Sequence, residues 1–140
     1  MENIPVSISI LDNSKTDGDN TKIELNTVGT FCGTPDDYTI VYTEQDEELR
    51  GCETTLHVEG RRRVTMSRGG SYSSEMVMEK AQRHTCHYST PYGDLMMGIF
   101  AHHVDSDVEN GEGKLEFFYT LDCNGGLLAK NELTVLVKPQ

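Results

Sequence analysis

Apolar side chains recur at every second position along almost the whole chain, and this alternation limits the possible folds more than any other feature. In one long run, Leu115, Phe117, Tyr119 and Leu121 alternate with more polar residues, and shorter runs repeat the pattern from Val6 onwards. Successive side chains of a β-strand point to opposite faces of the sheet, so the pattern predicts half-buried antiparallel strands. The spacing typical of an amphipathic helix is almost absent. We therefore predict an all-β protein.

Turn-forming sequences separate the alternating runs. Asp17-Gly18 and Asn110-Gly111 are dipeptides that supply the positive φ angles of tight hairpin turns. About ten runs follow one another at spacings of about 8–14 residues, which is typical of a sandwich or a barrel. A chain of 140 residues buries enough surface for one core and too little for two. We predict one domain, residues 1–140, folded as a single antiparallel barrel of about eight to ten strands.

The charge balance argues against several classes of partner. Lys and Arg number 12 against 23 Asp and Glu, which gives a formal net charge of −11. An acidic surface of this kind repels nucleic acids and acidic membranes, so we expect neither as a partner. No apolar run approaches the length of a membrane-spanning helix. The start, Met1-Glu2-Asn3, lacks the basic and apolar regions of a secretory signal, so we expect a cytoplasmic protein.

The middle and the end of the chain contain several distinctive motifs. They are Val64-x-Met66-x-Arg68-x-Gly70, Tyr88-x-Thr90-Pro91-Tyr92-Gly93-x-Leu95-x-Met97, and Leu115-x-Phe117-x-Tyr119-x-Leu121 followed by a Gly turn and Asn131-x-Leu133-x-Val135. Together these motifs resemble those of the YwiB-like family of small, uncharacterised bacterial β-barrels. The resemblance covers nearly the whole chain. It implies a single lipocalin-like (calycin) barrel in the bacterial cytoplasm, and it implies neither a reaction nor catalytic residues.

The cysteines and histidines do not predict a metal site. The four cysteines include no Cys-x-x-Cys pair, so we expect thiols in a reducing compartment and no structural zinc. Alternation places His102 and His103 on opposite faces of one strand. If residues 90–93 form a hairpin corner, Cys86 pairs near Met97 and His84 near Ile99. His102 then lies about 10 Å beyond His84, too far for one ion. We expect no metal and no cofactor.

No catalytic constellation is visible in the sequence. Cys86 and His87 are adjacent in a predicted strand, so their side chains point apart and cannot act as nucleophile and base. Phosphate-binding loops and hydrolase motifs are also absent. We therefore expect that the protein is not an enzyme.

The predicted barrel interior offers the best candidate site. Several polar residues occupy the same alternating positions as apolar residues that we expect to face inward. They are Arg68 after Val64 and Met66, His84 and Tyr88 on either side of Cys86, Tyr119 after Phe117, and Asn131 between Ala129 and Leu133. A few polar groups among apolar walls are typical of a small-ligand site.

The interior pattern leads to three hypotheses. The first is a non-enzymatic binder of a small, partly apolar ligand, with polar contacts from Arg68, His84, Tyr88, Tyr119 and Asn131. The second is a protein-interaction module with a solid core and an acidic outer surface. The third is an enzyme of unknown reaction.

Overall fold

The computed structural model describes residues 3–16, 18–43, 52–69, 73–90, 93–123 and 126–140, except for the side chains of residues 73, 88–90 and 95. The described residues form ten strands. These are β1 (Ile4–Thr16), β2 (Asp19–Thr34), β3 (Asp37–Thr43), β4 (Glu53–Glu59), β5 (Arg63–Gly69), β6 (Ser73–Glu79), β7 (Arg83–Thr90), β8 (Gly93–Glu109), β9 (Glu112–Cys123) and β10 (Gly126–Pro139).

Every strand pairs antiparallel with the strands next to it in the chain, and β1 pairs with β10. The sheet is therefore a closed barrel in the order β1-β10-β9-β8-β7-β6-β5-β4-β3-β2. This confirms the prediction of an all-β antiparallel barrel of about eight to ten strands. No helix long and apolar enough to cross a lipid bilayer occurs in the part of the chain that the structure describes.

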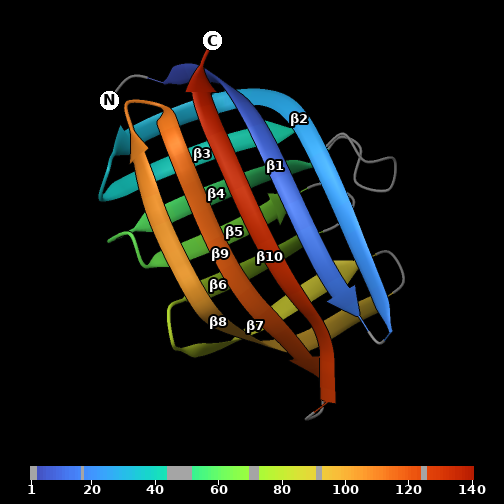
Figure 1. Cartoon of the computed structure of the whole chain (residues 1–140). Helices are drawn as coiled ribbons and strands as arrows, with labels where there is room; N and C mark the ends of the chain where they lie inside the picture. Colours follow the sequence, from blue (N-terminus) through green and yellow to red (C-terminus); the bar gives the residue numbers. More distant parts are fainter. Residues whose placement is uncertain (1–2, 17, 44–51, 70–72, 91–92, 124–125) are drawn as a thin grey trace.

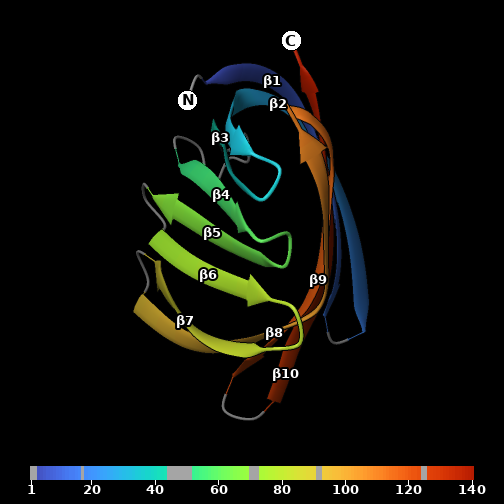
Figure 2. The ribbon, with the colours of Figure 1, turned by 90° about the vertical axis from the view of Figure 1, so that its left-hand side faces the viewer.

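The barrel wall consists of two groups of strands. Strands β8, β9, β10, β1 and β2 have 12 to 17 residues, whereas β3 to β7 have 7 or 8. Figure 1 shows the long strands running steeply across the front and the short strands crossing behind them. In Figure 2 the two groups lie on opposite sides of the interior.

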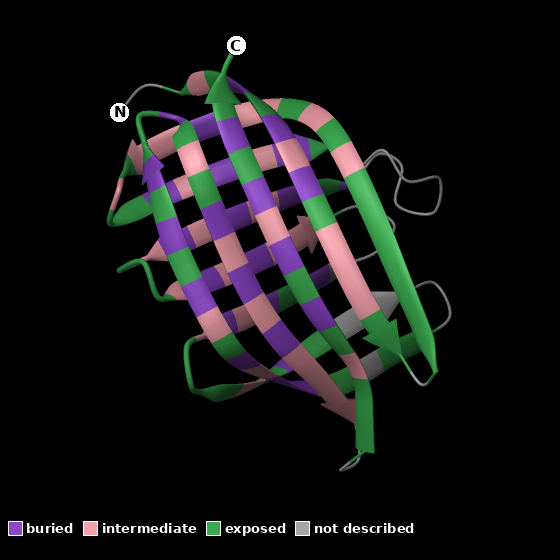
Figure 3. Cartoon of the chain, viewed as in Figure 1, coloured by how far each residue is buried: buried purple, intermediate pink, exposed green. Residues whose placement is uncertain are grey.

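Burial alternates along much of the barrel wall, as Figure 3 shows by the repeated change between purple and the other colours, so every second side chain there faces the interior. In β4, for example, Thr54, Leu56 and Val58 are fully buried, and the residues between them are only half-buried. Gly29 in β2 lies opposite Tyr42 of β3. A Cβ atom at Gly29 would collide with the Val41 carbonyl oxygen, so only glycine allows β3 to approach this closely.

The predicted hairpin between β7 and β8 has the expected register. Cys86 pairs with Met97, and His84 pairs with Ile99. Both predicted pairings are confirmed. They follow from alternation combined with the position of the corner, which fixes the register of a hairpin.

An extra residue in β8 changes which of its side chains face outward. The strand pairs with β9 at Ala101 and again at His103, and the register shifts between these two positions. Ala101 is buried before the shift and Val104 is buried after it. His102 is exposed and His103 half-buried, and both lie on the outer wall. The prediction that they face opposite ways is wrong, because a β-bulge adds a residue that interrupts simple alternation.

Candidate functional site

One row of polar residues crosses five neighbouring strands inside the barrel. The register places Tyr42 of β3 opposite Thr54 of β4, Thr54 opposite Arg68 of β5, Arg68 opposite Ser74 of β6, and Ser74 opposite Tyr88 of β7. We call these five residues the polar row. Tyr42, Thr54 and Ser74 are buried, and Arg68 is half-buried. The backbone of Tyr88 belongs to the row, but its side chain lies outside the described residues.

The next row along the same strands is entirely apolar. It contains Ile40, Leu56, Met66 and Met76, which lie opposite one another and are all buried. The interior of β3 to β6 therefore changes from apolar to polar at a single level.

Arg68 has the predicted orientation. It follows the buried residues Val64 and Met66 in phase, and its Nε donates a hydrogen bond of 3.4 Å to the Thr54 hydroxyl. Its positive charge also lowers the pKa of Tyr119 on the opposite wall, so the guanidinium acts across the interior. The phase predicted for this strand is confirmed.

Tyr119 of β9 is buried and is influenced electrostatically by polar groups on several strands. Burial raises the pKa of its hydroxyl, and Asp12, Cys86 and Tyr42 raise this pKa further, while Arg68 lowers it. Each of these groups must lie within electrostatic reach of the Tyr119 hydroxyl. The site therefore joins side chains from the long and the short strands.

Asp12 of β1 brings a carboxyl group into the same region. It continues the inward phase of Ile8 and Ile10, and burial raises its pKa above the ordinary value. Its Oδ1 is buried without a hydrogen-bond partner among the described residues, and the same is true of the Ser74 hydroxyl. Asn13 Oδ1 and Arg63 Nε are likewise buried without a described partner. Buried polar atoms are normally hydrogen-bonded, so the two atoms on the inward faces of β1 and β6 are able to pair with a bound molecule.

Asn131 of β10 belongs to this region as predicted. It is buried and lies directly opposite Tyr119. Sequence reasoning missed Asp12 and Tyr42, although the signal was present. Asp12 follows the alternation of Ile8 and Ile10 in the sequence, just as Arg68 follows Val64 and Met66.

His84 does not join the cluster. It lies opposite Ile99 of β8, and its Nε2 is 3.0 Å from Glu79 Oε1. Along β7 it is four positions from Tyr88, which is roughly 13 Å at the spacing of a β-strand. The structure therefore separates His84 from the polar row, because the row crosses the strands at one level and His84 lies at another.

Cys86 shows no sign of nucleophilic activation. Its side chain is buried, and burial raises the pKa of its thiol, although a hydrogen bond with the Met97 backbone opposes the shift. A thiol with a raised pKa remains protonated and reacts slowly as a nucleophile.

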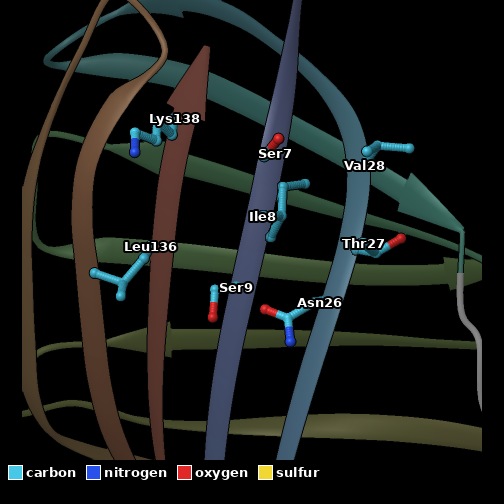
Figure 4. Close-up of a pocket in the computed structure, with 8 residues that line it drawn as sticks. All are labelled: Ser7, Ile8, Ser9, Asn26, Thr27, Val28, Leu136 and Lys138. Atoms are coloured by element: carbon cyan, nitrogen blue, oxygen red, sulfur yellow. The ribbon is translucent and has the colours of Figure 1, made fainter. Parts of the chain in front are cut away.

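A groove of about 490 Å³ lies on the outer wall and is separate from these residues. Figure 4 shows its side chains on β1, β2 and β10. They are Ser7, Ile8, Ser9, Asn26, Thr27, Val28, Leu136 and Lys138. None of the predicted site residues lines this groove.

The fold and the interior together define a closed ten-stranded antiparallel barrel with a polar row across β3 to β7 of its inner wall. The chain belongs to the family described as a domain of unknown function (DUF1934), whose model matches residues 8–135. This confirms the resemblance seen in the sequence.

A solved structure supports the same assignment of fold. The chain is similar to the ywiB protein from Bacillus subtilis, with a TM-score of 0.82 and 17% sequence identity, over 97% of this chain and 93% of that one. At this identity the likeness establishes the fold alone. The relation to lipocalins stays a prediction. No curated protein matches the chain significantly.

Proposed function

We propose that this protein is a non-enzymatic binder of a small, partly apolar ligand, which it holds inside the barrel against the polar row. The polar row carries this proposal, because buried Thr54 and Ser74 and half-buried Arg68 lie beside a row of buried apolar side chains. A few polar groups that converge among apolar walls are the usual composition of a small-ligand site.

The side chains specify the chemistry of the ligand. Arg68 provides donors for an anionic or carbonyl group. Asp12 Oδ1 and the Ser74 hydroxyl, both buried without described partners, offer acceptors for a ligand N–H or O–H. The apolar row of Leu56 and Met66 next to them would contact the hydrocarbon part of the ligand. We therefore expect a molecule with both a polar end and an apolar end.

The proposal that the protein is not an enzyme rests on the protonation state of the Cys86 thiol. Cys86 is the cysteine within reach of Tyr119, and burial keeps its thiol protonated by raising its pKa. Buried, unbridged thiols at Cys52 and Cys86 also suit a reducing compartment, so we propose that the protein acts in the cytoplasm.

Binding of anilinonaphthalene sulfonate, an apolar anion whose fluorescence rises in apolar surroundings, tests the proposal directly. We expect the folded protein to bind this dye, and we expect Arg68→Met to weaken the affinity by about ten-fold or more, because a hydrogen bond to a charged group contributes about 1.5–3 kcal/mol. Native mass spectrometry of protein purified from its own host should show added mass from a retained ligand. Arg68→Met should reduce the fraction of protein that carries this ligand.

Arg83→Met provides a matched control. Arg83 is an exposed arginine on the outer wall whose guanidinium Nη2 donates a 2.6 Å hydrogen bond to Asp122. The two variants change the net charge equally, so a loss confined to Arg68→Met locates the dye inside the barrel. Equal effects of both variants, or no dye binding by the folded protein, would contradict the proposal.

A protein-interaction module is the second candidate, and one observation favours it. Val28 and Leu136 are 56% and 48% exposed beside the outer groove, although most large apolar side chains of this chain are buried. If the interior is solid and the protein binds partners through its outer surface, the dye experiment will fail, and Arg68→Met will leave all binding unchanged.

A further inference from the structure

The bulge in β8 creates a second cluster of chemically active side chains, on the outside of the barrel. The extra residue turns His103 outward, onto the same face as Asp105. Asp105 lies directly opposite Glu116 of β9. One possible ligand atom from each of His103, Asp105 and Glu116 lies within 4.8 Å of the other two.

Two paired strands hold this cluster in place. The His103 ring packs against Phe118, with ring centroids 4.9 Å apart, which restrains the imidazole. β8 and β9 remain paired on both sides of the cluster, from Gly98 to Glu109. Side chains on paired strands need little reorganisation to bind an ion, which favours affinity.

The electrostatics of this hairpin favour a cation. Residues 105–116 contain five acidic side chains and one lysine. Like charges directly opposite in a sheet are destabilising, so the Asp105–Glu116 pair carries an energetic cost. Lys114 Nζ lies 3.3 Å from Glu116 Oε1 and compensates part of it. A divalent cation between the two strands would neutralise both carboxylates.

The imidazole distinguishes this cluster from an ordinary acidic surface and selects the type of ion. Imidazole nitrogen is a ligand for zinc and similar transition metals, whereas magnesium and calcium prefer oxygen alone. Zinc binds nitrogen and carboxylate oxygen at about 2.0–2.2 Å, which requires ligand atoms about 3–3.5 Å apart. The ligand atoms must therefore move closer together on binding, and Asp105 is exposed, so its side chain has room to rotate.

We propose that His103, Asp105 and Glu116 form a binding site for a divalent transition-metal ion of the zinc type, with water completing the coordination. The site lies on the outer wall and is independent of the proposed ligand in the barrel interior. The expectation of no metal site did not combine these histidines with carboxylates and assumed unbroken alternation in β8. Neither condition applies to this cluster.

Calorimetric titration of the full-length protein with zinc chloride, after treatment with a chelator, tests the proposal. We expect one site whose affinity falls by more than about ten-fold in each of His103→Asn, Asp105→Asn and Glu116→Gln, because loss of even a supporting group costs this much. We also expect zinc to raise the melting temperature of the unmodified protein, and magnesium at the same concentration to leave it unchanged.

His102→Asn is the matched control, because His102 is also on the outer wall, one residue away, with its ring nitrogen 3.4 Å from the Thr120 hydroxyl. This variant should retain full zinc affinity. Far-ultraviolet circular dichroism verifies that each variant is folded. The proposal is wrong if the protein does not bind zinc, if the three variants bind zinc normally, or if His102→Asn weakens binding as much as His103→Asn.

Discussion

Buried polar atoms have hydrogen-bond partners in one part of the barrel interior and lack described partners in another. At one level the Tyr38 hydroxyl, fully buried in β3, is hydrogen-bonded to the Ser106 hydroxyl of β8 at 2.5 Å. Elsewhere in the interior, the Ser74 hydroxyl of the polar row and Asp12 Oδ1 of β1 are buried without a partner among the described residues. The same short strands contribute to both levels.

This difference separates the parts of the interior that stabilise the fold from the part that is available for binding. A buried hydrogen bond between two side chains stabilises the fold modestly, and an unsatisfied buried polar group destabilises it. A protein tolerates such a cost at functional sites, where a ligand provides the missing interaction. The comparison therefore predicts opposite effects for equivalent substitutions at the two levels.

The largest effect should come from the apolar row. Leu56 is fully buried, so Leu56→Ala should lower the free energy of unfolding by about 2–5 kcal/mol, through lost burial and the cavity left behind. Urea unfolding at neutral pH measures this value. A loss below about 1 kcal/mol would mean that the interior is loosely packed at this level as well.

The next effect should appear at the paired hydroxyls. Ser106→Ala removes the partner of the buried Tyr38 hydroxyl and should destabilise the fold by about 1–3 kcal/mol. The double variant with Tyr38→Phe should recover part of the loss, because it removes the unsatisfied hydroxyl as well. If the double variant is no more stable than Ser106→Ala alone, the hydrogen bond does not explain the loss.

Asp12→Asn should change how stability depends on pH. Burial raises the pKa of Asp12 in the folded protein above its unfolded value, so the folded state binds its proton more tightly. The resulting destabilisation is absent below the unfolded pKa and develops as the pH rises through the folded pKa. The amide should therefore increase stability at neutral pH and have a smaller effect at pH about 3. Urea unfolding at both pH values tests this, and an equal effect at both would contradict it.

The smallest effect should have the opposite sign to that of Ser106→Ala. Ser74→Ala removes a buried hydroxyl without a described partner, so it should increase the free energy of unfolding by about 0.5–1 kcal/mol. The same variant should bind anilinonaphthalene sulfonate no better than the original protein. A loss of stability equal to that of Ser106→Ala would show that the two levels do not differ.

Alternation predicts the inward face of a strand only where no bulge interrupts the strand. In β5, Arg68 lies inside as predicted, because seven residues without a bulge preserve the phase set by Val64 and Met66. In β8, the register shift between Ala101 and His103 reverses the phase of every later residue. The prediction for His103 failed at this point, since nothing local in the sequence distinguishes a bulge from a regular strand.

The polar cluster could be predicted in part. Alternation identifies Arg68, Tyr119 and Asn131 as inward-facing, and it would have identified Asp12 if applied there too. It could not separate His84 from the others, because phase gives the face of a strand and not the level along the barrel. The level depends on the pairing of β3 to β7, which sets Arg68 opposite Thr54 and Ser74.

The strands, their antiparallel order and the inward faces of the strands without a bulge could be predicted from the sequence alone, because these follow from local alternation and from turns between neighbouring segments. Tertiary structure alone decided which inward residues meet. Closure of the barrel brings Asp12 of β1 and Arg68 of β5 to the same tyrosine of β9. A single bulge in β8 places His103 on the outer face of the barrel, beside Asp105 and Glu116. Both depend on the register between paired strands, including a shift of one residue, which the pattern within a single strand does not specify.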